Sequence, residues 1–196
     1  MVAVRQFVEH EVLEDIMVTF WRHGYLATSI DDLAAATGLK RGSLYAAFGD
    51  KKAMFLRAYA LYEATYEAPL LTTLSDGGLN TALNRFYSHV LTALADDAQP
   101  PGCLIAQIMS ESTGRGDDIE AAAQATLNRS VAAFKALLVR AQQTGELAAN
   151  ADTEILAWSL ASTNRSMAMI YRLTKDLNMA RGIADAAMQK LPLQTP

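Results

Sequence analysis

Cationic side chains gather near the N-terminal end of this 196-residue chain. Between positions 37 and 57 a single aspartate, Asp50, faces five basic residues. These are Lys40, Arg41, Lys51, Lys52 and Arg57. Cations clustered in this way can neutralise the phosphates of a nucleic acid and release its counterions. The whole chain carries a formal charge of −4, so the cluster is a local basic footprint on an acidic protein, and nucleic acid stays open as a partner.

Two short helices joined by a tight turn are expected to position these cations. Thr28 can cap the first helix, with Asp31 at the spacing of a capping box, and Gly38 ends it. The second helix is expected over residues 41–48. Such a helix-turn-helix unit fits its second helix into the major groove of DNA, where the first residues of that helix face base edges. A basic helix pair can equally be a solvated surface, so a longer pattern has to decide between the two.

That longer pattern covers residues 24–55, which have the sequence GYLATSIDDLAAATGLKRGSLYAAFGDKKAMF. The segment resembles the N-terminal domain of TetR-family transcriptional regulators: Gly-Tyr after the first helix, Gly-Ser-Leu-Tyr in the recognition helix, and Lys at the start of the fourth helix. The resemblance implies a three-helix DNA-binding domain over residues 1–50. It also implies an all-helical ligand-binding and dimerisation domain over residues 51–196, joined to the first by a helix over about 51–68.

The resemblance implies seven residues that contact DNA. They are Thr28, Lys40, Arg41, Gly42, Ser43, Tyr45 and Lys51. Arg41 matches a contact to a base edge or a phosphate, and Lys51 matches the position that holds a phosphate at a helix N-terminus. Tyr45 stays open between DNA contact and packing at the edge of the core, whereas the helical spacing of Leu44 and Phe48 predicts core positions for both.

Three positions depart from the family pattern. Ala46 and Ala47 stand where many members have bulky aromatic or histidine side chains, which predicts sparse direct readout of bases. Asp31 occupies a position that is often basic; it would repel phosphate but could accept from a cytosine amine.

Lys52 and Arg57 are expected to be ordinary solvated charges rather than DNA contacts.

The rest of the chain has apolar residues at helical spacing, and no segment alternates like a strand. With 51% hydrophobic and 19% charged residues, the chain can bury a sizeable core. We therefore predict an all-α protein of about nine helices. The sequence has no apolar run that could span a bilayer and no signal-peptide pattern, which predicts a cytoplasmic protein without a membrane partner.

The resemblance implies a cavity for a small, apolar or aromatic effector in the C-terminal domain. The candidate lining residues are Phe86, Tyr87, Met109, Phe134, Trp158, Met167 and Tyr171. Each of them could equally belong to the core, since amphipathic helices need such residues in any case. Four polar residues interrupt apolar stretches and could either orient a polar group of the ligand or lie exposed. They are Asn128, Arg129, Asn164 and Arg165.

Two helices near the C-terminus, over about residues 152–175 and 179–191, are expected to pair across a two-fold axis, as the resemblance implies. The interface candidates are Ala157, Leu160, Ala161, Met167, Ala168, Ile183 and Ala187. A symmetric homodimer presents two recognition helices to successive major grooves and so binds a palindromic operator. The resemblance further implies that effector binding moves the fourth helix and releases the DNA, with repression as the commoner outcome.

Cys103, the single cysteine, follows a Pro-Pro-Gly turn at a helix start. The helix dipole there could make it an electrophile-sensing thiol, and a buried, inert cysteine is the simpler alternative.

His10, His23 and His89 share no metal-ligand spacing, so neither a metal nor a cofactor is expected. The sequence has no nucleophile–base constellation or phosphate-binding loop, which argues against an enzyme. The alternatives to a ligand-responsive regulator are a thiol-sensing regulator and an architectural DNA binder without an effector.

Overall fold

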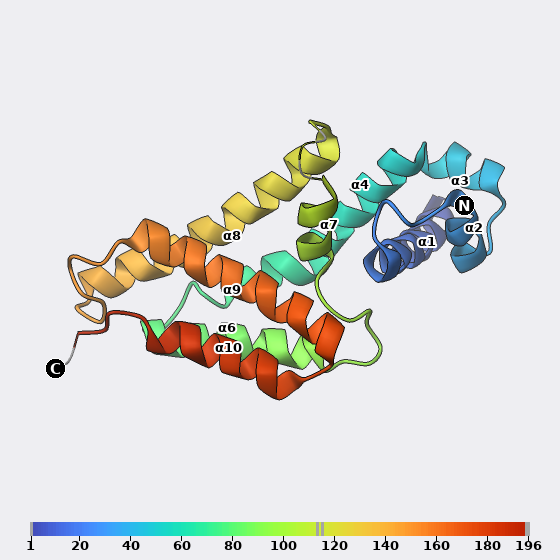
Figure 1. Ribbon diagram of the computed structural model, residues 1–196. Coiled ribbons are helices and arrows are strands. Elements are labelled where there is room, and N and C mark those ends of the chain that lie inside the picture. Colours follow the sequence, from blue (N-terminus) through green and yellow to red (C-terminus); the bar gives the residue numbers. More distant parts are fainter. Residues whose placement is uncertain (1, 113, 115, 195–196) are drawn as a thin grey trace.

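The computed structural model describes residues 2–112, 114 and 116–194, with side chains described from residue 9 onward. In this part of the chain the regular elements are helices, apart from one isolated bridge between Leu147 and Leu193. Figure 1 shows an elongated molecule, with the N-terminal helices at one end and the helices of the C-terminal half at the other. The all-α prediction is confirmed. Among the described helices, none is long and apolar enough to cross a membrane.

The N-terminal end is built from four helices. They are α1 (Val2–His23), α2 (Ile30–Thr37), α3 (Arg41–Phe48) and α4 (Lys51–Tyr62). Phe20 of α1 and Phe55 of α4 meet edge to face, with ring centroids 5.1 Å apart. Leu33 of α2 and Leu44 of α3 are fully buried in the same cluster. These apolar contacts fix the short helices α2 and α3, which are too short to be stable by themselves.

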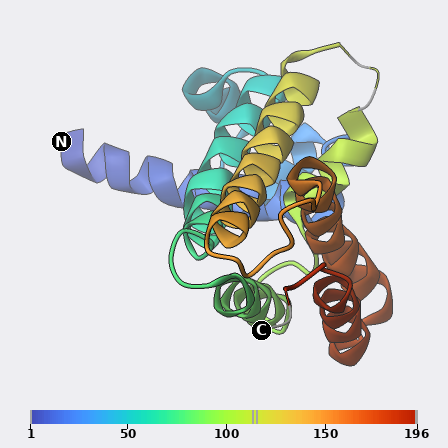
Figure 2. The same ribbon diagram turned by 90° about the vertical axis from the view of Figure 1, so that its left-hand side faces the viewer.

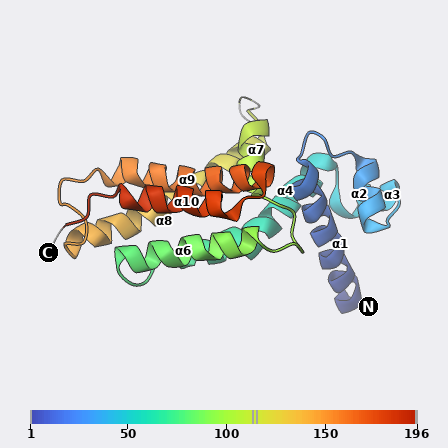
Figure 3. The same cartoon turned by 60° about the horizontal axis from the view of Figure 1, so that its bottom comes forward.

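The remaining helices form the C-terminal part. They are the π-helical turn η1 (Glu63–Glu67), α5 (Ala68–Thr72), α6 (Leu79–Leu94), α7 (Leu104–Ser112), α8 (Asp118–Gln143), α9 (Thr153–Thr174) and α10 (Leu177–Gln189). Figure 3 shows α6, α8, α9 and α10 running alongside one another. Phe86 of α6 and Phe134 of α8 pack at 5.0 Å in the core between them. In Figure 2, α9 and α10 lie together on one side of this bundle.

The predicted N-cap of α2 is wrong by one residue. Ser29, and not Thr28, is the N-cap: its hydroxyl accepts from the Asp32 amide at 3.1 Å, and the Asp32 carboxylate accepts from the Ser29 amide at 2.7 Å. The capping box therefore uses Asp32 rather than Asp31. Hydrogen bonds from the Ser29 hydroxyl and amide lower the pKa of the Asp32 carboxyl, which keeps this cap charged at neutral pH.

Residue types set the other ends of the short helices, and the end of α2 at Gly38 is as predicted. Gly38 ends α2 in a left-handed conformation, with φ of 68°, and Gly49 ends α3 with φ of 83°. Asp50 caps α4, since its carboxylate accepts from the Ala53 amide at 2.8 Å. The sequence thus fixes the length of α3 at eight residues between two glycine-containing turns.

The helix that begins at Lys51 was expected to end at about residue 68. It continues past Pro69 and ends at Thr72. Pro69 has no N–H, so it cannot complete the normal helical hydrogen bond to the carbonyl four residues earlier. The chain widens into the π turn η1, in which the Ala68 amide donates to the Glu63 carbonyl, and α5 then continues to Thr72. When α4, η1 and α5 are taken as one continuous helix, the described residues form nine helices, in agreement with the prediction.

Candidate nucleic-acid interface and cavity

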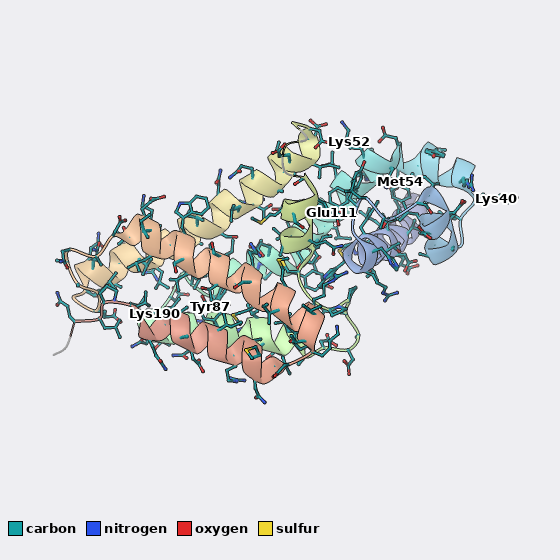
Figure 4. The ribbon with its side chains drawn as sticks, viewed as in Figure 1. Lys40, Lys52, Met54, Tyr87, Glu111 and Lys190 are labelled. Atoms are coloured by element: carbon teal, nitrogen blue, oxygen red, sulfur yellow. The ribbon has the colours of Figure 1, made fainter. Side chains whose placement is uncertain are left out.

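The first residues of α3 form an exposed surface at the outer end of the molecule. Figure 4 shows Lys40 at this end, and Gly42 and Ser43 are exposed beside it. A methyl group added at Gly42 would lie in open space, so this stretch of backbone can be approached closely from outside. Tyr45 is 49% exposed, which places it on this surface rather than in the core.

Leu44 and Phe48, on the opposite side of α3, are buried as predicted. Their burial holds α3 against the bundle while its other face stays in solvent. The helix therefore meets the first requirement for reading a groove: it is anchored from behind and presents small and polar residues in front.

Arg41 does not project freely from α3. Its Nε and Nη2 both donate to the carboxylate of Asp31 on α2, in a two-point ion pair that joins the two helices. Both side chains are well exposed, so the pair is screened by solvent and contributes little to stability. A phosphate or a guanine can therefore compete for the guanidinium of Arg41, and Asp31 limits the positive charge of this surface until that exchange occurs.

Lys51 is held at the N-terminus of α4. Its Nζ lies 3.5 Å from the Leu26 carbonyl and 4.6 Å from the ring centroid of Tyr25. Lys51 is the first residue of α4, and the helix dipole favours an anion at this end. This geometry suits a phosphate contact and leaves Lys51 among the candidate DNA contacts.

The resemblance implies a DNA contact through either the hydroxyl or the amide of Thr28, and the structure makes the hydroxyl unavailable. Its side chain is only 2% exposed, and the hydroxyl donates to the Gly24 carbonyl at 2.5 Å. The side chain closes the turn between α1 and α2 instead. The motif predicted where Thr28 lies in the chain, but it did not predict which group the Thr28 hydroxyl contacts.

Lys52 and Arg57 are not simple solvated charges. Lys52 donates to Asp118 of α8 at 2.7 Å, and this hydrogen bond raises the pKa of the Lys52 ammonium. Arg57 pairs with Glu9 at 2.6 Å and lies over the Phe48 ring. Both side chains therefore have partners within the protein, which the prediction of ordinary solvated charges did not include.

A cavity of about 310 Å³ lies where the N-terminal and C-terminal parts of the molecule meet. Its aromatic wall comes from Trp21 of α1 and from Tyr62 and Tyr66 of the continuous helix α4–η1–α5, which is called the long helix below. Trp21 packs against Tyr62 and Tyr66 with ring centroids 4.8 and 5.2 Å away. The opposite wall is made by α6 and α9, including Val90, Leu94, Asn164, Arg165 and Ala168.

None of the seven candidate effector contacts lines this cavity. Phe86, Tyr87, Phe134 and Met167 are fully buried in the core between the long helices. Met109 packs against the N-terminal core, and Trp158 is partly exposed and donates to Glu154 at 3.2 Å. Tyr171 is also buried in the C-terminal core. The helical spacing that predicted burial was correct, but it does not separate core positions from cavity positions.

A buried ion pair forms the polar part of the cavity. Both nitrogens at the end of the Arg165 guanidinium donate to the Glu67 carboxylate of η1, and Nη2 also lies 2.7 Å from the Ser130 hydroxyl of α8. Arg165 is 6% exposed and Glu67 is 4% exposed. Of the four polar candidates, Asn164 and Arg165 line the cavity, whereas Asn128 and Arg129 are exposed on α8.

Besides the Lys52–Asp118 pair, contacts of Glu111 and Arg172 hold the N-terminal helices against the C-terminal part. Glu111 of α7, labelled in Figure 4, accepts from the Leu26 amide at 2.9 Å. Arg172 of α9 donates to the Trp21 and Arg22 carbonyls at the end of α1, at 3.1 and 2.7 Å. An arginine at the C-terminus of a helix satisfies carbonyls that lack helical partners. The sequence pattern gave no signal for either contact, because both join segments far apart in the chain.

The predicted dimer contacts are wrong for most of their residues. Ala157, Leu160, Ala161, Met167 and Ala168 face the core of their own subunit and are buried. Ile183 and Ala187 are half-buried against the same core. The other side of α9 and the adjoining side of α10 carry the exposed apolar residues. These are Ile155, Trp158, Met169, Leu173 and Met179.

No group of three or more potential metal ligands occurs in the described residues.

Comparison with known proteins then decides the family. Residues 12–58 match the model described as bacterial regulatory proteins of the tetR family, and residues 80–187 match the tetracyclin repressor-like C-terminal domain. The chain belongs to the TetR family. It is a DNA-binding transcriptional regulator and not an enzyme.

Two full-length relatives agree with this assignment. The chain is 26% identical over 189 residues to the uncharacterised HTH-type regulator YezE of Bacillus subtilis, covering 95% of this chain and 97% of YezE. It is 26% identical over 190 residues to the HTH-type transcriptional repressor ComR of Escherichia coli, covering 95% of this chain and 90% of ComR.

A solved structure shows the same TetR-family fold. The regulator CifR, as a cysteine mutant complexed with a 26-base-pair operator DNA, is 24% identical with a TM-score of 0.83. The match covers 92% of this chain and 95% of the CifR chain. The likeness therefore supports the fold over most of the chain.

Proposed function

We propose that this TetR-family protein is a cytoplasmic, ligand-responsive repressor that binds a palindromic operator as a homodimer. The observation that supports the ligand response is the position of the cavity. One wall is Trp21 of α1, which belongs to the DNA-binding end, and another is α9, which lies at the exposed apolar surface. A molecule in this cavity touches both parts of the protein and can change their relative position.

DNA contact is assigned to the exposed surface of α3 and the start of α4. Gly42 and Ser43 approach base edges, while Lys40 and Lys51 hold phosphates on either side of the groove. Arg41 joins them when it exchanges Asp31 for DNA. Few of these side chains can make base-specific hydrogen bonds, which fits a protein that obtains much of its affinity from phosphates.

The homodimer is assigned to the exposed apolar surface of α9 and α10. Ile155, Trp158, Met169 and Leu173 share one side of α9, where Leu173 is 83% exposed. Exposed apolar residues gathered on one surface mark an interaction site. A two-fold pairing of α9 and α10 buries them in a four-helix interface and sets the distance between the two copies of α3.

The effector acts by moving the long helix that begins at Lys51. Tyr62, Tyr66 and Glu67 of this helix line the cavity, and Lys51 lies at its DNA-binding end. A ligand that fits only one position of the helix shifts the population toward that position. Release follows when the two copies of α3 no longer match successive major grooves. The aromatic wall favours an aromatic or apolar ligand with a polar group directed at Asn164 or Arg165.

Binding to the DNA beside the chain's own gene tests the proposed function. Fluorescence anisotropy should show tight, sequence-selective binding at moderate salt, and a set of aromatic ligands screened at the cavity should include one that weakens it. A ligand that binds the protein but leaves DNA affinity unchanged would refute the ligand response. Strong dependence on salt without dependence on sequence would favour the architectural alternative.

A further inference from the structure

Cys103 lies in the wall of the cavity, immediately before α7. Its thiol is free and half-buried, and its carbonyl accepts from the Gln107 amide at 3.2 Å in the first helical turn. Two donors converge on the sulfur: Arg165 Nη1 at 3.5 Å and the Tyr62 hydroxyl at 3.7 Å. The sulfur is therefore placed next to a cation, in a cavity that a small molecule can enter.

The two donors keep their protons at neutral pH. Burial raises the pKa of the Tyr62 phenol well above its usual value, so the hydroxyl remains a donor. Burial opposes the charged form of Arg165, but Cys103 and Glu67 outweigh it and raise the pKa of the guanidinium. Donors of this kind stabilise the thiolate, which is the form of the cysteine that reacts with electrophiles.

Unsatisfied polar atoms around the same cavity provide a second, independent observation. In the described part of the chain four buried side-chain atoms have no hydrogen-bond partner, and three belong to residues that line this cavity. They are Trp21 Nε1, Arg165 Nε and Gln99 Oε1. Buried donors normally find an acceptor. The two N–H groups therefore point to a bound molecule that carries an oxygen acceptor.

We propose that Cys103 is a covalent attachment site for α,β-unsaturated carbonyl compounds. The inference rests on the proposed function in one respect, since it assigns the same cavity to the effector. The class follows from two needs: a soft carbon electrophile for the sulfur and a carbonyl oxygen for the unpartnered donors. The apolar wall at Val90 and Leu94 accommodates the hydrocarbon part of such a molecule.

The reaction is an addition that needs no oxidant and releases no leaving group. The sulfur of Cys103 forms a bond to the β-carbon, and the π bond between the α- and β-carbons breaks. Its electron pair moves toward the carbonyl oxygen, where the N–H groups of Trp21 or Arg165 stabilise the enolate. The proton lost by the thiol is returned through solvent to the α-carbon, which leaves a saturated thioether.

The adduct lies where it can affect DNA binding. Cys103 contacts Arg165, which joins α9 to Glu67 of the long helix, and Tyr62 belongs to that same helix. A group attached to the sulfur occupies the cavity between α9 and the helix that carries Tyr62 and Glu67, and so can change the relative position of these two elements. We expect the modified protein to bind its DNA more weakly than the unmodified protein.

Intact-protein mass spectrometry tests the attachment, with methyl vinyl ketone as the probe and butanone, which lacks the alkene, as the control. One equivalent of methyl vinyl ketone should add to the full-length protein, on the peptide that contains Cys103, and butanone should not add. The Cys103→Ser variant should form no adduct. An exposed thiol, made as Asn80→Cys in the Cys103→Ser background, should react more slowly than Cys103. Tyr62→Phe should slow the reaction by up to about tenfold, through loss of one hydrogen bond.

The possible results separate this inference from the proposed function. Reaction at Cys103 no faster than at the exposed thiol would overturn the inference, and so would an adduct with unchanged DNA affinity. A protein that binds DNA selectively but forms no adduct would contradict the inference alone. A protein that forms the adduct rapidly but binds no DNA before modification would contradict the proposed function and support Cys103 as the attachment site.

Discussion

Replacing Glu67 by alanine is expected to lower the free energy of unfolding by about 3–5 kcal/mol. The carboxylate is buried, and it is the partner of the buried Arg165 guanidinium. Its removal leaves a positive charge in the interior, whose remaining hydrogen-bond partners among the described residues are the Ser130 hydroxyl and the Cys103 sulfur. Chemical denaturation of the purified variant measures the change directly.

Two further variants show whether burial is the cause. Lys135→Ala removes one partner of the exposed Lys135–Glu154 pair and should change the unfolding midpoint little, because solvent screens that pair. The double variant Glu67→Leu, Arg165→Met replaces the buried pair by apolar groups and should recover most of the lost stability. If Glu67→Ala were no more destabilising than Lys135→Ala, the ion pair would not be the desolvated link between η1 and α9 that the structure shows.

The second large effect is expected at Gly42. Alanine at this position should raise the stability of the protein by about 0.5–1 kcal/mol, because glycine is unfavourable within a helix and the added methyl group meets no neighbour. The same methyl group should weaken DNA binding by about 1–3 kcal/mol, or roughly ten- to hundredfold, if the backbone of α3 approaches base edges. Thermal unfolding and fluorescence anisotropy measure the two quantities.

The opposite signs of these changes make the Gly42→Ala result specific. A misfolded variant would lose stability and affinity together. Ala136→Ser, which adds one atom to an exposed position of α8, is the matched control and should leave DNA affinity unchanged. A Gly42→Ala protein that is more stable and binds DNA as tightly as the wild type would remove α3 from the interface.

The N-terminal part could be predicted closely because residue types fix its geometry. Gly38 and Gly49 have the positive φ that their turns require, and Asp50 caps α4, so the bounds of α3 follow from the sequence. The cap of α2 was displaced by one residue because Thr28 and Ser29 are adjacent and have the same capping chemistry. Only the packed structure shows that the hydroxyl of Thr28 turns inward to Gly24.

The cavity and the proposed dimer surface could not be predicted from helical spacing. Phe86 and Phe134 have the helical spacing that residues lining a cavity would also have, because core positions and cavity positions are both shielded from water. The Ala-rich side of α9 was assigned to the partner subunit, but it packs in the core. Leu173 and Met169 form the exposed side. A helix with two apolar sides gives no sequence signal for which one faces the core.

Chemical footprinting on the DNA beside the chain's own gene tests the central claim most directly. Hydroxyl-radical cleavage maps the protected backbone, and methylation protection at guanine N7 reports contacts in the major groove. Two symmetric half-sites centred about one helical turn, or roughly 10 base pairs, apart are expected, each with major-groove protection. A single protected half-site, or protection confined to the minor groove, would contradict DNA recognition by paired copies of α3.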